Sequence, residues 1–70
     1  MTPKKGRVQN NIRELRTARA LSQGELAEIV GATRQTINAI EQEKYAPTLE
    51  LAFRIAIAFG VGFEEVWQFK

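Results

Sequence analysis

Apolar residues recur along most of this chain at intervals of three or four positions, the spacing of one face of an α-helix. The pattern predicts five helices and no strands. The expected helices run from about Gln9 or Asn10 to Arg19, over about 23–30, over about 34–42, from Leu49 to Phe59, and over Phe63 to Trp67. Residues 1–8 contain Pro3 and Gly6 without apolar periodicity, so we expect a flexible basic N-terminal arm there. We expect one all-α domain over residues 9–70.

The junction between the second and third expected helices carries clear local signals. Ser22 and Glu25 have the spacing of a capping box, in which each side chain accepts a hydrogen bond from the other residue's backbone N–H. Gly31 suits the left-handed position that ends a helix, and Thr33 can cap the next helix. An ordinary helical hairpin would share some of these signals. The short turn, the small Ala27 and the polar start of the third helix favour a helix-turn-helix, whose second helix enters the DNA major groove.

The composition narrows the chemistry open to the chain. The 70 residues include no Cys, no His and no Asp, and all eight acidic residues are Glu. The usual zinc ligands are therefore missing, as are the Ser-His and Cys-His pairs of nucleophilic catalysis. We expect no enzyme activity, no metal and no cofactor. The sequence has neither an apolar run of membrane-spanning length nor a signal-peptide core, so we expect a soluble cytoplasmic protein of the prokaryotic cytosol or nucleoid.

The net charge of +2 conceals a difference between the two ends of the chain. The basic residues among positions 1–20 are Lys4, Lys5, Arg7, Arg13, Arg16 and Arg19, and Glu14 alone opposes them. Positions 21–70 hold the other seven Glu against four Lys and Arg. The basic end could therefore lie on DNA phosphates while the acidic part faces away. A solvated basic tail would show the same composition, so charge alone leaves both interpretations open.

Motifs spread over the chain resemble a known family. They are Ile12-Arg13-Glu14-Leu15-Arg16, Leu21-Ser22-Gln23, Glu25-Leu26-Ala27, Gly31, Arg34-Gln35-Thr36-Ile37-Asn38-Ala39-Ile40-Glu41, Lys44-Tyr45, Pro47-Thr48-Leu49 and Glu64-Glu65-Val66. In these residues the chain resembles, from about Asn10 to Phe69, the lambda-repressor-like helix-turn-helix regulators of the Cro/C1 or XRE class, and among them the minimal single-domain members. The resemblance implies a compact five-helix DNA-binding domain with the helix-turn-helix at its second and third helices.

Two positions depart from the family pattern. Gln42-Glu43 replaces the usual Asn-Gly before Lys44, and a left-handed Glu43 would cost about 1 kcal/mol that Gly avoids. Gly24 stands where the family has a larger polar residue. Gly inside a helix costs about 1 kcal/mol relative to Ala. In the first turn, however, it could let the backbone approach a phosphate.

The third expected helix opens with side chains suited to reading DNA. The candidates for base contact are Thr33, Arg34, Gln35 and Asn38. The candidates for phosphate contact are Arg13, Gln23, Thr36 and Lys44. Arg can pair bidentately with guanine, and Gln or Asn with adenine. The family resemblance implies the Gln23 contact, and the positive end of a helix dipole supports it. The opening side chains could instead form a solvated face, and Thr36, Asn38 and Lys44 each suit base or phosphate.

The resemblance also implies an ion pair between Arg16 and Glu41, which would tie the first helix to the end of the third. A possible homodimer patch consists of Phe63, Val66, Trp67 and Phe69, although these side chains could instead pack inside the domain.

Together these observations predict a sequence-specific regulator of transcription that binds double-stranded DNA, represses as a homodimer and recognises an inverted-repeat operator. The alternatives are a protein-binding helix-turn-helix, such as an antitoxin with a toxin partner and secondary DNA binding, and a purely structural interaction module. We expect no membrane contact and no small-molecule ligand.

Overall fold

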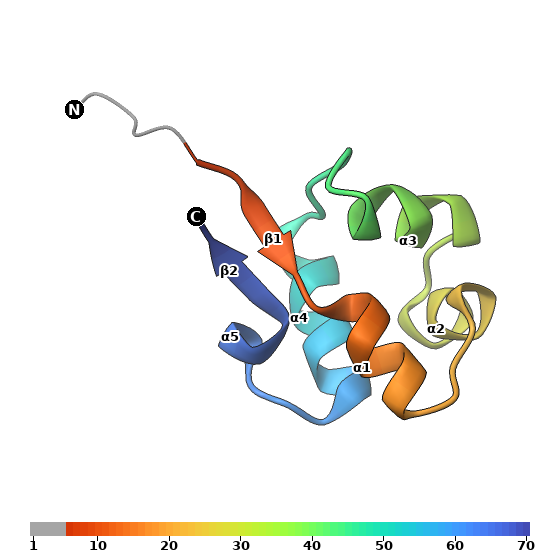
Figure 1. Cartoon of the computed structure of the whole chain (residues 1–70). Coiled ribbons are helices and arrows are strands. Elements are labelled where there is room, and N and C mark those ends of the chain that lie inside the picture. The colour runs from red at the N-terminus through yellow and green to blue at the C-terminus, as the bar shows by residue number, and fades with distance from the viewer. Residues whose placement is uncertain (1–5) are drawn as a thin grey trace.

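The computed structural model describes residues 6–70 and contains five helices in this range (Figure 1). They are α1 (Ile12–Ala18), α2 (Gln23–Val30), α3 (Arg34–Glu41), α4 (Leu49–Phe59) and α5 (Phe63–Val66). The helices surround one core, in which Ile12, Leu26, Ile37, Ile55 and Val66 have no exposed surface. Each helix therefore contributes at least one completely buried side chain, and the arrangement is a lambda-repressor-like all-α fold.

Side-chain caps set the starts of three helices. The Ser22 hydroxyl accepts the Glu25 backbone N–H at 3.0 Å, and the Glu25 carboxylate accepts the Ser22 N–H at 2.8 Å, which completes the predicted capping box. The hydrogen bond from the Ser22 backbone lowers the pKa of the Glu25 carboxyl. Thr33 and Thr48 cap α3 and α4 in the same way, each accepting a backbone N–H from three residues on.

Four helices end at a residue in the left-handed conformation. Two are glycines, Gly31 at φ 75° and Gly60 at φ 71°, but the other two are Ala20 at φ 54° and Glu43 at φ 60°. After α3 the Glu43 N–H bonds to the Ile40 carbonyl, and the next N–H bonds to that of Ala39. This hydrogen-bond pattern closes the helix whichever residue occupies the left-handed position. Glu43 therefore takes the left-handed conformation, although it stands where the family usually has glycine.

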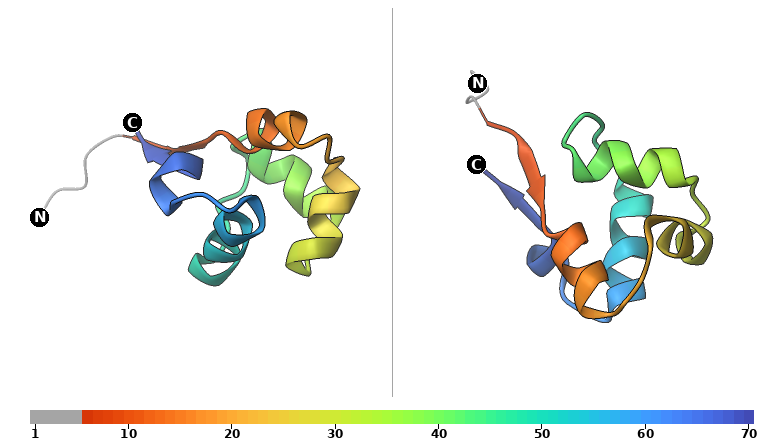
Figure 2. Two further views of the ribbon diagram at one scale, coloured as in Figure 1. Left: turned by 90° about the horizontal axis from the view of Figure 1, so that it is seen from below. Right: turned by 45° about the vertical axis from the view of Figure 1, so that its right-hand side comes forward.

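The expectation of no strands was wrong. β1 (Val8–Asn10) pairs antiparallel with β2 (Trp67–Phe69), and Val8 lies opposite Phe69. Figures 1 and 2 show the two strands side by side, on the opposite side of the molecule from α2. The pairing leaves no helical backbone for Gln9, so α1 begins at Ile12 rather than near Gln9. Three-residue strands are too short to display an alternating pattern.

The predicted arm over residues 1–8 is also changed by this pairing. Residues 1–5, with Lys4 and Lys5, lie outside the described residues. The Arg7 N–H donates to the Lys70 carbonyl at 2.7 Å, and the Lys70 N–H donates back at 3.1 Å. Val8 belongs to β1. The end of the predicted arm is therefore held by backbone hydrogen bonds to the C-terminal segment, and the domain includes it.

Candidate DNA interface

Helix α3 lies at the outside of the molecule, held there by its apolar side (Figure 1). Ile37 and Ile40 are fully or almost fully buried, whereas Thr33, Arg34 and Gln35 are exposed. Successive positions in a helix are about 100° apart, so the same short segment presents one apolar and one polar face. The polar opening of α3 is thus available to a partner while the inner face fixes its position.

The side chains of Arg34 and Gln35 have no hydrogen-bond or ion-pair partner among residues 6–70. A guanidinium carries five donors and a Gln amide carries both donors and an acceptor, so these groups are free to bind a ligand. The geometry of both groups suits the edges of bases in the major groove.

Thr33 and Thr36 are already engaged with each other. Their hydroxyls lie 2.9 Å apart, and the Thr33 hydroxyl also accepts the Thr36 backbone N–H at 3.1 Å. The Thr33 oxygen therefore serves first as the helix cap. A contact from either residue to DNA would depend mainly on its methyl group or on the remaining capacity of its hydroxyl.

Asn38 has a partner that the sequence did not point out. The Gln42 amide N–H donates to the Asn38 side-chain carbonyl at 2.6 Å, one helical turn further on. Asn38 is half-buried, and the bond restricts the orientation of its amide. In the sequence, Gln42 stands out only as a departure from the family pattern. Its spacing of four residues from Asn38 was the signal that could have identified it.

The predicted Arg16–Glu41 pair is present and largely shielded from solvent. The guanidinium donates to both carboxylate oxygens, at 2.7 and 3.1 Å, and the two side chains are only 14% and 8% exposed. Arg16 also donates to the Leu21 carbonyl at 2.9 Å. The hydrogen bond with Glu41 raises the pKa of Arg16, although burial acts in the opposite direction. This pair fixes α1 against the end of α3.

Gln23 joins the same network from the first turn of α2. Its amide donates to Glu41 at 3.2 Å, so its side chain is bonded within the domain and not directed wholly to solvent. A phosphate at Gln23 would have to meet the backbone N–H groups of this helix end or share the amide. The neighbouring Gly24 is not required by internal packing, because an added Cβ would meet only the Ser22 hydroxyl, at 3.9 Å.

A hollow of about 290 Å³ lies between α1, the start of α2 and α3. It is lined by Arg13, Arg16, Gln23, Asn38, Glu41 and Gln42. Arg13 is exposed and its side chain has no partner among the described residues, so it is the cation of this hollow that remains free. Lys44, just beyond α3, is likewise exposed and unpaired within residues 6–70, but it does not line the hollow. The structure thus brings together three predicted contact residues, Arg13, Gln23 and Asn38.

Two of the four residues of the predicted dimer patch are buried in the core. Val66 has no exposed area, Trp67 is 7% exposed, and the Trp67 indole N–H donates to the Ala52 carbonyl at 3.1 Å. A small domain uses its largest aromatic side chain to fill its core, because burial of that area stabilises the fold. Of the four residues, Phe69 is well exposed and Phe63 is half-buried against Phe53.

No helix within residues 6–70 has the length and apolar character needed to cross a membrane. That range also contains no group of three His, Cys, Asp or Glu side chains that could hold a metal ion.

These features define a class of protein. Two short helices are joined at a left-handed glycine, and the second presents Arg and Gln side chains that have no partner within residues 6–70, which is the arrangement of a helix-turn-helix DNA-binding domain. Comparison with known proteins agrees. The helix-turn-helix family model matches residues 12–66.

Similar proteins are regulators of the same kind. An HTH-type transcriptional regulator of Methanocaldococcus jannaschii is 43% identical over 90% of this chain and 96% of its own length. YgzD, an HTH-type transcriptional regulator of Bacillus subtilis, is 45% identical over 86% of this chain and 91% of its own. The crystal structure of the restriction-modification controller protein C.AhdI from Aeromonas hydrophila is similar with a TM-score of 0.73 and 33% identity, covering 77% of this chain and 78% of that one.

The chain belongs to the helix-turn-helix family of the Cro/C1 or XRE type. It is a transcriptional regulator with a helix-turn-helix DNA-binding domain, as the sequence predicted.

Proposed function

We propose that this protein is a sequence-specific repressor that acts as a homodimer on an inverted-repeat operator in double-stranded DNA. Each copy inserts α3 into the major groove of one half-site. Arg34 and Gln35 read base edges, together with Thr33 and Asn38. Phosphate contacts from Arg13, Gln23, Thr36 and Lys44 fix the orientation of the domain on the duplex.

The observation that carries this proposal is that Arg34 and Gln35 have no side-chain partner within residues 6–70. Both lie exposed in the first turn of a helix whose other face is buried, and neither is used by the fold. An exposed Arg on a helix positioned in this way can make a bidentate contact to guanine, worth about 1–3 kcal/mol of discrimination. One recognition helix contacts few base pairs, so two copies related by a two-fold axis give a longer site.

The direct test is selection from a pool of random DNA duplexes at near-physiological salt. We expect an inverted repeat with half-sites about one helical turn apart, roughly 34 Å. The selected site is then measured with Arg34→Lys and Lys70→Ala. Arg34→Lys keeps the charge but loses the bidentate geometry, whereas Lys70→Ala removes an exposed charge on the C-terminal segment.

Arg34→Lys should lower affinity for the selected site by roughly 5- to 150-fold and relax the preference at one base pair, while Lys70→Ala changes neither. Recovery of no motif, with weak and strongly salt-dependent binding alone, would reject sequence-specific regulation through α3. A reporter placed downstream of the selected site decides the sign of regulation, and increased expression on adding the protein would overturn the repressor assignment.

The alternative function is that of a protein-binding helix-turn-helix, such as an antitoxin that holds a toxin. Exposed apolar side chains on α4, at Leu49 and Ile57, are the observation in its favour, because such groups suit a protein partner. In that case Arg34→Ala and Gln35→Ala would leave activity intact, and a second polypeptide would copurify with the protein in a fixed ratio.

A further inference from the structure

An exposed apolar stripe runs along α4. Leu49, Phe53 and Ile57 are 68%, 48% and 74% exposed and follow each other at intervals of four residues. At about 100° per residue they form a nearly straight ridge beside the buried side of the helix. We call these three residues the α4 stripe. It contains three large apolar groups in 11 residues of helix, far more than scattered single exposures would give.

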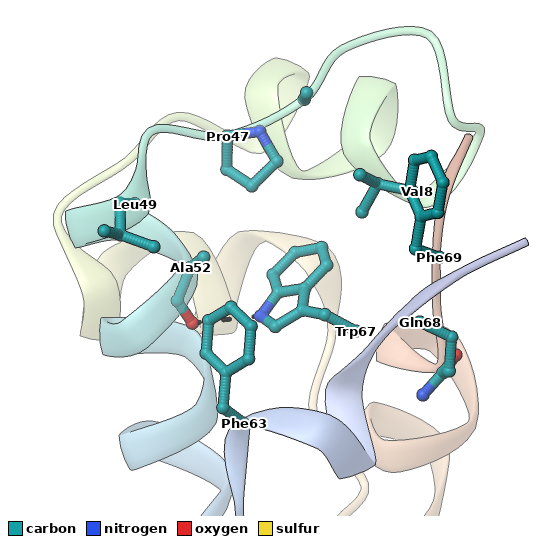
Figure 3. Close-up of a pocket in the computed structure, with 9 residues that line it drawn as sticks. Val8, Pro47, Leu49, Ala52, Phe63, Trp67, Gln68 and Phe69 are labelled. Carbon is teal, nitrogen blue, oxygen red and sulfur yellow. Dashed lines mark hydrogen bonds between the residues drawn. The ribbon is translucent and has the colours of Figure 1, made fainter. Parts of the chain in front are cut away.

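The α4 stripe borders an apolar groove of about 360 Å³. The groove lies between the start of α4, the loop before it and the two strands, and its lining includes Val8, Pro47, Leu49, Phe63, Trp67 and Phe69. Figure 3 shows Trp67 between Pro47 and Phe63, with Leu49 toward one end and Val8 and Phe69 toward the other. Leu49 belongs to both features, and the Phe53 and Phe63 rings, 4.9 Å apart, join them into one surface.

This surface has the properties of a contact between identical copies. In a two-fold contact one patch must be complementary to itself, and a projecting part beside a hollow part can meet this condition. The α4 stripe supplies the ridge and the groove supplies the hollow. Glu50 and Arg54 run along the outer side of the stripe and bond to each other at 2.6 Å. Opposite charges in one row are self-complementary, because a two-fold axis sets the Arg of one copy near the Glu of the other.

We propose that the α4 stripe and the adjoining groove form the homodimer interface, with the second copy of this chain as the occupant. This inference rests on the proposed function, which requires a two-fold dimer but does not locate its interface. None of the residues on this surface belongs to the candidate DNA contacts, so both surfaces can be occupied at once. The proposal revises the patch expected from the sequence: Phe63, Trp67 and Phe69 line the groove, whereas Val66 is completely buried.

Ile57→Lys tests the interface with little risk to the fold, because Ile57 is the most exposed residue of the stripe. The matched control is Ile29→Lys, the same substitution at a 58% exposed position on α2 that lies outside the stripe and the groove. Sedimentation equilibrium measures dimer dissociation for the wild type and both variants, and thermal unfolding verifies that each is folded.

We expect Ile57→Lys to raise the dimer dissociation constant at least about 30-fold, because a charged group would replace an apolar one at the interface, and Ile29→Lys to leave it unchanged. Equal effects of the two substitutions, or a wild type that stays monomeric both in solution and on operator DNA, would overturn the proposal. The proposal would also be overturned if the wild type did not self-associate but bound a different protein, and if Ile57→Lys abolished that binding. The surface would then be the site of that partner.

Gel-shift titration separates failure of this interface from failure of the proposed function. If the interface is correct, Ile57→Lys loses cooperative binding to the full inverted repeat but keeps its affinity for an isolated half-site. Retained cooperativity would reject the interface while leaving sequence-specific regulation standing. Absence of any sequence preference in the wild type would instead reject the proposed function, whatever its oligomeric state.

Discussion

The junction of α1 with α3 and the opening turn of α3 both carry an Arg and a Gln, but the structure uses them in opposite ways. At the junction, Arg16 and Gln23 both donate to one carboxylate, that of Glu41, and the Arg is only 14% exposed. At the opening of α3, Arg34 and Gln35 are exposed and have no partner within residues 6–70. The residue types are the same, and only their surroundings differ.

This difference separates residues that hold the DNA-binding helix in position from residues that can contact DNA. A charged group withdrawn from water must be paired, since an unpaired buried charge is costly. A group that is to bind a ligand must keep its donors free until the ligand arrives. Arg16 and Gln23 therefore hold the end of α3 in place through Glu41, whereas Arg34 and Gln35 are available to DNA. The comparison predicts that substitutions at the two sites affect different measured quantities.

Arg16→Ala should have the largest effect, on the free energy of unfolding. It leaves Glu41 nearly buried with Gln23 as its remaining side-chain partner, and breaking one member of a buried pair costs about 3–5 kcal/mol. That is a large part of the free energy of unfolding of a small domain, which is roughly 0.05–0.15 kcal/mol per residue. Urea unfolding followed by the fluorescence of Trp67, the single Trp of the chain, measures the loss at fixed protein concentration.

Two variants make this test specific. Arg34→Ala removes the exposed arginine at the opening of α3 and should change the free energy of unfolding by less than about 0.5 kcal/mol, as substitutions of exposed residues usually do. The double substitution Arg16→Met with Glu41→Leu removes both charges and should recover most of the lost stability, because apolar replacement of a whole buried pair is often neutral. If Arg16→Ala reduced DNA affinity without reducing stability, the assignment of the two sites would be reversed.

Much of the helix-turn-helix could be anticipated from the sequence, because helix caps and turns follow from local rules. Ser22 with Glu25, Gly31 and Thr33 predicted the capping box, the turn and the next cap at the positions where they occur. The Arg16–Glu41 pair came from the family resemblance, since no local rule connects residues 25 positions apart.

The parts that were missed depend on long-range contacts. β1 and β2 are joined across almost the whole chain, and three residues give no periodicity to detect. The sequence left Trp67 open between a dimer patch and the core, and its indole N–H donates to the carbonyl of Ala52 in α4. The left-handed Ala20 carries no glycine signal at all. Burial and partner, which decide between core, interface and solvent, are not readable from residue type.

The end of α3 offers a smaller test of which contacts maintain the helix. Glu43→Gly should raise the free energy of unfolding by about 1 kcal/mol, because Glu43 lies at φ 60° and glycine adopts this conformation without steric cost. Thermal and urea unfolding measure the gain. Arg7 lies 3.4 Å from the Glu43 carboxylate, but that pair is exposed and contributes little.

Glu43→Ala is the matched control, since it removes the same ion pair and keeps a side chain at the left-handed position. It should not stabilise the protein. Gly60→Ala provides the opposite case, at φ 71° with open space around an added Cβ, and should destabilise by a similar amount. Equal stability of the Gly and Ala variants at position 43 would show that backbone strain is not what distinguishes this helix end.

The smallest expected effects concern Arg13 and Lys44, the cations near the proposed base-reading face, which consists of Thr33, Arg34, Gln35 and Asn38. Arg13 and Lys44 are proposed to contact phosphates, so each Ala substitution should reduce the slope of log affinity against log salt by about 0.9. Fluorescence anisotropy over a salt series measures this slope on the selected site and on an unrelated duplex. The loss should be the same on both, since phosphates carry no sequence information.

Lys70→Ala, which removes an equal charge on the C-terminal segment, should leave the slope unchanged. A fall in affinity limited to the selected site would instead place Arg13 or Lys44 among the base-reading residues, and the reading face would then extend beyond the opening of α3.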